Sequence, residues 1–111
     1  MNTSPFQALA DPTRRHLIEA LRGGEQSVNE LVARVAIEQP GVSRHLRILS
    51  AAGFVRVRPH GTQRLYSLRG EPFRELEAWL ARYRSLWEAR LERLARQLEP
   101  QQRAAARRRR P

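Results

Sequence analysis

Residues 39–49 read QPGVSRHLRIL and decide the fold. Pro40 can occupy the first turn of a helix, and Gly53 can cap the C-terminus of the same helix. Apolar residues recur between them at helical spacing, at Val42, Leu46 and Leu49. The pattern therefore predicts a helix with one buried face and one polar face.

A second short helix is expected directly upstream. Ser27 and Glu30 have the spacing of a capping box, in which a hydroxyl and a carboxylate satisfy free amides at a helix start. This helix should run to about Val35, and a break at residues 36–38 separates it from the next one. Two short helices joined by a tight turn form a helix-turn-helix, whose second helix would enter the major groove of DNA.

A β-hairpin is expected after the two helices. Apolar and basic residues alternate from Phe54 to Arg58, and a second strand-like run extends over residues 63–68. The connection, residues 59–62, contains Gly61, which suits a turn. A hairpin in this position would be the wing of a winged helix-turn-helix.

A long amphipathic helix is predicted from Pro72 to about Leu98. At 1.5 Å per residue it would extend roughly 40 Å, and so small a body cannot cover its whole apolar side. Packing against a partner helix is the simplest way to bury this apolar side. Its apolar positions follow one another at intervals of three or four residues, at Phe73, Leu76, Leu80, Tyr83, Trp87, Leu91, Leu94 and Leu98, and Trp79 and Leu86 widen the stripe.

These elements predict a mostly α fold with a small β-hairpin, a winged helix-turn-helix with a long C-terminal helix. A chain of 111 residues has the size of one domain. We assign residues 1–99 to that domain. Residues 100–111 form a basic, alanine-containing tail with nothing to pack, and we expect this tail to be disordered.

The charge of the chain favours a polyanionic partner. All 21 basic residues are arginine, against 11 acidic residues, for a net charge of +10. Without cysteine the chain can form neither disulfides nor thiolate metal sites. Residues 1–15 lack the apolar core of a signal peptide, and no apolar run approaches the ~20 residues that span a bilayer. We therefore expect a cytoplasmic protein with no membrane partner.

Several motifs in register resemble the ArsR family of bacterial repressors. Besides residues 39–49, they are FQALADPTRR at 6–15, AGFV at 52–55 and GTQRLYSL at 61–68. The likeness covers roughly residues 5–98 in the family's order of elements. It implies a homodimer that sits on a palindromic operator and blocks transcription. The last helix would then form the dimer interface, through Phe73, Leu76, Trp79, Leu80, Tyr83, Trp87 and Leu91.

Many members of this family sense metals, through cysteines on the first helix of the helix-turn-helix or through carboxylate and histidine pairs on the last helix. Here residues 28–35 and 69–98 contain no cysteine and no histidine. The histidines are His16, His45 and His60, in three different predicted elements, whereas a transition-metal site needs its ligands in one place. We therefore expect a metal-independent branch of the family, with no metal and no cofactor.

The polar face of the second helix supplies candidate DNA contacts, namely Gln39, Ser43, Arg44, His45 and Arg47. Arg44 can place a bidentate fork on guanine and Gln39 on adenine. Ser43 and His45 suit phosphate contacts near a helix N-terminus, and His45 fits a half-buried packing role nearly as well. Glu38 could cap the helix, pair with an arginine or accept from cytosine.

The predicted wing carries polar residues around its turn, namely Arg58, His60, Thr62, Gln63 and Arg64. They suit contacts with a minor groove or with flanking phosphates, and an ordinary charged hairpin is the alternative. Arg14 and Arg15 lie at the start of an earlier helix, where positive charge is unfavourable, so each needs a negatively charged partner. Pairing with Asp11 or Glu19 explains them as well as contact with DNA does.

Two other functions remain open. The arginine tail would also suit an RNA-binding or ribosome-associated protein, although no exposed aromatic platform for stacked bases is evident. The long helix would also suit a module that holds a different protein. No cluster of nucleophile, base and orienting residue points to an enzyme. The sequence leaves a small-molecule or protein inducer unknown, and a ligand pocket between Trp79, Tyr83 and Trp87 is the minority reading of those aromatic residues. We therefore expect a repressor that binds double-stranded DNA and is not an enzyme.

Overall fold

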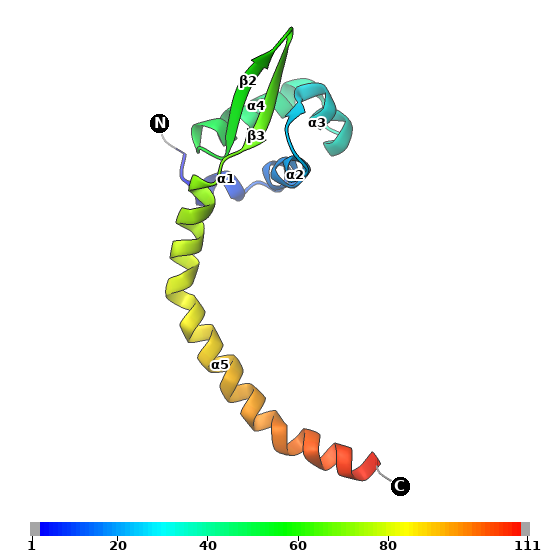
Figure 1. Cartoon of the computed structure of the whole chain (residues 1–111), viewed down its shortest axis with the longest axis vertical. Coiled ribbons are helices and arrows are strands. Elements are labelled where there is room, and N and C mark those ends of the chain that lie inside the picture. The colour runs from blue at the N-terminus through cyan, green and yellow to red at the C-terminus, as the bar shows by residue number, and fades with distance from the viewer. Residues whose placement is uncertain (1–2, 110–111) are drawn as a thin grey trace. The chain divides into compact units, whose positions relative to one another are not determined.

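The computed structural model describes residues 3–109, which form two units (Figure 1). The first unit ends at Leu76 and the second begins at Glu77. The first unit contains α1 (Pro5–Leu9), α2 (Pro12–Leu21), β1 (Gln26–Ser27), α3 (Val28–Val35), α4 (Gln39–Ala51), β2 (Val55–His60) and β3 (Gln63–Leu68). Helix α5 (Glu71–Arg109) begins in the first unit and makes up the described part of the second. The predicted winged helix-turn-helix is confirmed.

The capping box at the start of α3 is formed as predicted. The Glu30 backbone N–H donates to Ser27 Oγ over 3.3 Å, and the Ser27 backbone N–H donates to Glu30 Oε1 over 3.0 Å. The hydrogen bonds from Ser27 also hold the pKa of Glu30 below its usual value. Helix α3 ends at Ala36, which has a φ of 54° and turns the chain toward α4.

Helix α4 begins and ends where its sequence predicts. Pro40 lies in its first turn, and Gly53 just beyond its C-terminus has a φ of 82°, a conformation that glycine adopts without strain. The Phe54 backbone N–H then donates to the Leu49 carbonyl oxygen over 2.9 Å, the bond that closes a Schellman cap. The chain is thereby turned from α4 into the wing.

The hydrophobic core of the first unit lies between α2, α3, α4 and the start of β2. Its largest fully buried side chains are Leu17, Leu31, Val42, Leu46, Leu49 and Phe54. The predicted inward stripe of α4, Val42 with Leu46 and Leu49, is therefore confirmed. Phe73 packs edge-on against Phe54 with ring centroids 5.2 Å apart, and Leu76 also packs against this core. The polar side of α4 is left free to face outward.

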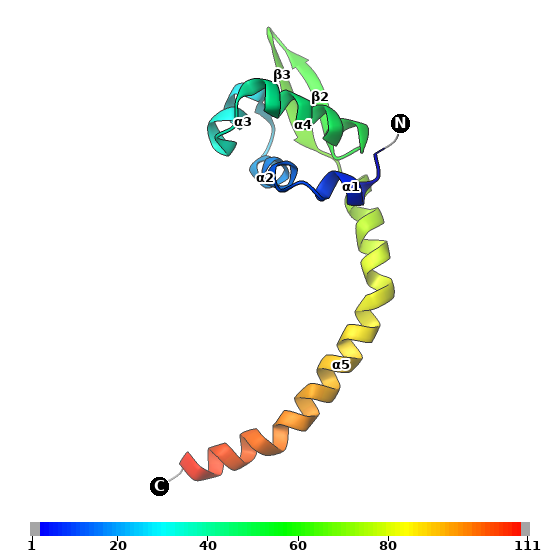
Figure 2. The same cartoon turned by 180° about the vertical axis from the view of Figure 1, so that it is seen from behind.

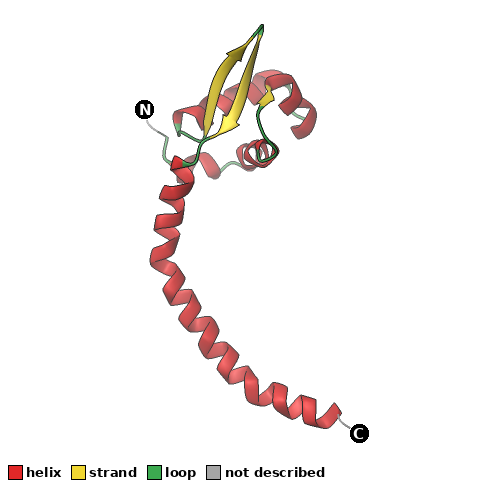
Figure 3. Cartoon of the chain, in the orientation of Figure 1, coloured by secondary structure: helices red, strands yellow, loops and turns green. Residues whose placement is uncertain are grey.

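The wing is a hairpin of β2 and β3, and β1 adds a third antiparallel strand in the order β1-β3-β2 (Figure 3). The sequence did not predict β1, because two residues are too few for an alternating pattern. The turn is also tighter than expected. Pro59 pairs with Arg64 and His60 with Gln63, so only two residues connect the strands. The first of them, Gly61, has a φ of 61°, as a two-residue hairpin turn requires.

Helix α5 is longer than its apolar pattern predicts. The stripe ends at Leu98, yet the helix continues through Pro100 to Arg109, over residues rich in glutamine, alanine and arginine. These residue types have high helix propensity. The division between a folded domain and a tail at residue 100 stays a prediction, and Arg110 and Pro111 lie outside the described residues. None of the helices over residues 3–109 combines the length and hydropathy needed to cross a membrane.

Candidate nucleic-acid interface

The outward side of α4 carries the polar residues singled out from the sequence. Gln39, Arg44 and Arg47 are exposed, and Ser43 and His45 are half-buried. Helix α4 packs beside the hairpin, as the view from behind shows (Figure 2). With the apolar side of α4 buried in the core, Ser43 and Arg47 lie toward the wing, whereas His45 contacts Arg14 of α2.

Grooves lie between α4 and the wing. One is lined by Ser43, Arg47 and Ser50 of α4 together with Arg64 of β3. Another is lined by Gln39 together with Thr62, Gln63 and Arg64, and by Asn29 at the start of α3. The structure thus brings together Gln39, Ser43, Arg47, Thr62, Gln63 and Arg64. Arg44 and His60 are exposed but line neither groove.

Arg58 of the wing already has a partner. Its Nε and Nη2 atoms each donate to a carboxylate oxygen of Glu25 over 2.7 Å, which makes a bidentate ion pair. These hydrogen bonds lower the pKa of Glu25 and raise the pKa of Arg58. The positive charge expected at this position of the wing is therefore balanced by a carboxylate that precedes β1.

His45 is held by Arg14 of α2. Arg14 Nη1 lies 3.3 Å from His45 Nδ1, and a guanidinium can only donate, so Nδ1 accepts and Nε2 is left for another hydrogen bond. The same guanidinium donates from Nε to the Ala8 carbonyl oxygen over 2.7 Å and from Nη2 to the Gln7 carbonyl oxygen over 3.1 Å. The packing role weighed for His45 is therefore present, and its phosphate contact stays a prediction.

Arg14 and Arg15, at the start of α2, both make hydrogen bonds or ion pairs within the chain. Arg14 lies 4.0 Å from Asp11, one of the two pairings expected. Arg15 donates from Nη1 to the Leu9 carbonyl oxygen over 2.5 Å. Both guanidiniums therefore satisfy carbonyl groups at the C-terminal end of α1, where positive charge is favourable. The sequence pattern did not reveal this use of them.

Glu38 occupies the N-cap position of α4, but its side chain makes no capping hydrogen bond. Instead its backbone carbonyl oxygen accepts from the N–H groups of Gly41 and Val42 over 3.0 and 3.1 Å. The connection between α3 and α4 leaves little space here, since a Cβ on Gly41 would lie 3.0 Å from Ile37 Cγ2. The capping role considered for Glu38 is absent from the structure.

Three residues of this surface were missed from the sequence. Ser50 follows Ser43 by seven residues and Arg47 by three, and this helical spacing could have revealed it. Asn29 and Glu25 approach the wing only because α3 and β1 pack against β3. No pattern of neighbouring residues in the sequence predicts that they belong to this surface.

The residues expected at a dimer interface fall into two groups. Phe73 and Leu76 contact the core of the first unit. In the second unit the apolar side chains stay exposed in the single chain, with Trp87 at 59% and Leu91 at 60%. Trp79 and Tyr83 lie with ring centroids 5.0 Å apart, and Arg90 stands 5.8 Å over the Trp87 ring.

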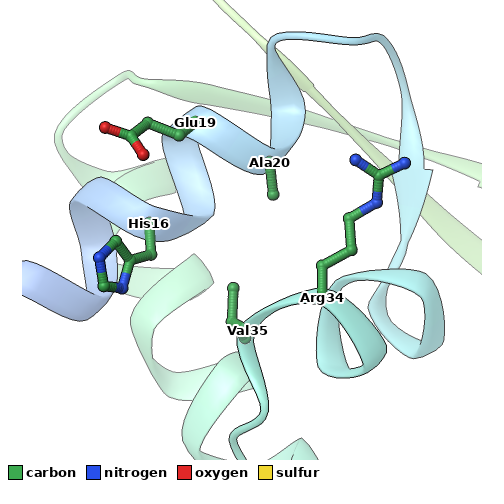
Figure 4. A pocket seen from close by; sticks show the side chains of 5 residues that line it. All are labelled: His16, Glu19, Ala20, Arg34 and Val35. Atoms are coloured by element: carbon green, nitrogen blue, oxygen red, sulfur yellow. The ribbon is translucent and has the colours of Figure 1, made fainter.

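A shallow pocket between α2 and α3 contains one of the histidines (Figure 4). It is lined by His16 and Glu19 of α2 and by Arg34 of α3, whose permanent positive charge disfavours a bound cation. Over residues 3–109 no group of three or more histidine, aspartate or glutamate side chains is placed to hold a metal ion. The absence of metal sensing stays a prediction.

A helix-turn-helix whose outward polar face adjoins a wing defines a winged helix-turn-helix DNA-binding protein. Comparison with known proteins agrees, since a family model described as a helix-turn-helix domain matches residues 9–58. The crystal structure of an ArsR family transcriptional regulator superposes with a TM-score of 0.68 at 39% identity, over 76% of this chain and 87% of that one. The chain belongs to the ArsR family of transcriptional regulators.

Two curated relatives are named as repressors. The transcriptional repressor SdpR of Bacillus subtilis is 30% identical over 78 residues, which are 70% of this chain and 87% of SdpR. A probable mercury resistance operon repressor of Streptomyces lividans is 43% identical over 67 residues, 60% of this chain and 53% of that protein. The chain spans little more than half the length of several curated relatives that it matches.

Proposed function

We propose that this protein represses transcription as a homodimer that binds a palindromic operator in double-stranded DNA. Helix α4 enters the major groove, and the wing lies against flanking phosphates or the adjacent minor groove. The observation that carries this proposal is the polar side of α4, where Gln39, Arg44 and Arg47 are exposed and where Gln39 and Arg47 line grooves with Arg64 of the wing.

Some of the proposed DNA contacts read bases, and others position the protein on the phosphate backbone. Arg44 and Gln39 have the side chains that read guanine and adenine, and the structure leaves both exposed. Ser43, Arg47 and His45 act on phosphate, the last through its Nε2 atom. In the wing, His60, Thr62, Gln63 and Arg64 contact the backbone, and Arg58 does so after it leaves Glu25.

The homodimer forms through the exposed apolar side of α5. Five of the proposed interface residues lie in the second unit and remain exposed in the single chain, namely Trp79, Leu80, Tyr83, Trp87 and Leu91. A second copy would remove this surface from water and offer a second α4 to the next turn of the duplex, about 34 Å away.

The protein acts without sensing a metal. Cysteine is absent from the sequence, and the three histidines lie on α2, α4 and β2. One relative is named for mercury resistance, so metal response is tested directly. Operator binding is expected to be unchanged by micromolar Zn²⁺ or Hg²⁺, and release of the DNA by either ion would contradict this part of the proposal.

The proposal is tested by titrating the purified protein against a palindromic fragment of its own promoter and against a scrambled fragment of equal length. With about six to ten phosphate contacts, affinity should fall roughly 10³- to 10⁵-fold between 50 and 200 mM salt. The palindrome should bind more tightly at every salt concentration. Equal affinity for the scrambled fragment would refute sequence-specific repression.

Replacing Arg44 with alanine is expected to reduce discrimination between operator and scrambled DNA roughly 5- to 150-fold, because a bidentate base contact is worth about 1–3 kcal/mol. The readout is the ratio of the two dissociation constants at one salt concentration. Arg22→Ala is the matched control, since Arg22 is exposed at the end of α2. If Arg44→Ala discriminates as well as the parent, Arg44 does not read a base.

Replacing Glu25 with glutamine is expected to strengthen binding to any duplex. The substitution removes the carboxylate that pairs with Arg58 and so frees a cation for phosphate. One additional phosphate contact would steepen the slope of log K against log salt by about 0.9. Glu19→Gln removes the same charge from an exposed position on α2 and serves as the control. An identical salt slope in the two variants would show that Arg58 stays away from DNA.

A further inference from the structure

The second unit contains an 11-residue repeat. Residues 77–87 read EAWLARYRSLW and residues 88–98 read EARLERLARQL, so both begin with Glu-Ala and share the leucine and the arginine at their fourth and sixth positions. Eleven residues make just over three turns of a helix, so equivalent positions lie on one side. The apolar stripe of α5 follows this repeat, because Leu80, Tyr83 and Trp87 recur as Leu91, Leu94 and Leu98.

Five of the arginines in the second unit occupy the side of the helix opposite to the stripe. Nine residues make two and a half turns, and Arg96, Arg103 and Arg107 follow Trp87, Leu94 and Leu98 by nine residues each. Arg82 and Arg93 lie on the same broad side. We call Arg82, Arg93, Arg96, Arg103 and Arg107 the arginine face, and all five are exposed.

The charge of this face is not balanced within the unit. Residues 77–111 contain ten arginines and four glutamates, and this net charge of +6 is more than half of the total of +10. The ion pair recorded for the face joins Arg103 to Glu99 over 3.8 Å, and both side chains are solvated. Exposed ion pairs of this kind contribute little to stability. Arg96 makes a long hydrogen bond of 3.5 Å to the Glu92 carbonyl oxygen.

We propose that the arginine face is a second DNA-binding surface, which contacts the phosphate backbone of a duplex without reading its sequence. This inference rests on the proposed function, because the DNA held by the first unit is the polyanion at highest local concentration. Dimerisation through the apolar stripe leaves the opposite side of the helix free. The surface therefore adds to the affinity of the winged helix-turn-helix and not to its selectivity.

The observations favour a duplex over other polyanions. Single-stranded nucleic acids are held by aromatic side chains between basic ones. The aromatic residues of this unit, Trp79, Tyr83 and Trp87, line a pocket with Leu80 and Arg84, on the apolar side that the proposed dimer would cover. A membrane would bind by burying that apolar side, and a dimer covers it. The arginine face itself offers guanidinium groups at intervals, a pattern that suits the charge of a phosphate backbone.

The test replaces Arg96, Arg103 and Arg107 with glutamine in the full chain and measures binding to a duplex of unrelated sequence at several salt concentrations. If each arginine contacts one phosphate, the slope of log K against log salt should fall by roughly 2 to 3 per protomer. The matched control replaces the same three residues with lysine, which keeps the charge and should keep the slope. The ratio of operator to scrambled affinity should be unchanged in both variants.

An unchanged slope in the glutamine variant would overturn the inference. So would a loss of binding confined to single-stranded RNA or to vesicles containing anionic lipid, because either would assign the face to another partner. If the triple glutamine variant loses helicity or changes its sedimentation, Arg103→Gln and Arg107→Gln are measured singly, each with an expected fall of about 0.9. Failure of the proposed function is seen separately, as equal affinity of the parent chain for operator and scrambled DNA.

Discussion

Replacing Leu91 with glutamate is expected to turn the dimer into a monomer and to weaken operator binding about 10²- to 10⁴-fold. Leu91 is 60% exposed in the single chain and lies within the apolar stripe, so a dimer would bury a carboxylate there with no partner. A monomer holds one half-site and loses the avidity of two linked modules. Sedimentation velocity and titration of the operator measure the two effects.

The control for this prediction is Ala89→Glu. Ala89 precedes Leu91 by two residues, which places it 200° away around the helix axis, on the side that a partner does not cover. The same charge is thereby added to the same turn of the helix, and the dimer should persist. If both variants sediment as the parent does, the apolar stripe of α5 is not the dimer interface.

Replacing Phe54 with alanine is expected to destabilise the first unit by about 3–5 kcal/mol, the range found when a buried aromatic side chain is truncated. Phe54 is fully buried at the junction of α4 and the wing, and its ring packs edge-on against Phe73. The loss would be a large share of the stability of a small domain. Operator binding should fall with it, because α4 and the wing lose their common support.

Urea unfolding followed by circular dichroism or amide exchange measures this loss. Tryptophan fluorescence would miss it, because Trp79 and Trp87 both lie in the second unit. Val57→Ala is the control, since Val57 lies three residues further on, in β2, but is 41% exposed, and its truncation should cost much less. A loss below about 1 kcal/mol for Phe54→Ala would show that the core does not depend on this side chain.

The sequence predicted those features that depend on neighbouring residues. The capping box of Ser27 and Glu30 and the glycine cap at Gly53 are local hydrogen-bonding patterns, and both formed as expected. The inward stripe of α4 follows from helical spacing alone. The caps and the stripe together predict which side of α4 is polar, and this side carries most of the candidate site.

Features that depend on residues far apart in the chain could not be predicted in this way. Glu25 meets Arg58 across 33 residues, and Arg14 meets His45 across 31. Each pairing exists because the core brings two elements together, and each engages a candidate DNA-binding side chain within the chain. Strand β1 was missed for the same reason, since it is defined by its pairing with β3.

The 11-residue repeat of the second unit also bears on how two copies align. A repeat of this length gives 3.67 residues per turn, which favours nearly straight or slightly right-handed winding of paired helices. A partner that slid by one repeat, about 16 Å, would meet apolar residues again. The bulky Tyr83 and Trp87 in the first repeat stand where Leu94 and Leu98 stand in the second. The two alignments of the proposed dimer would therefore differ in packing volume, and we expect this difference to select between them.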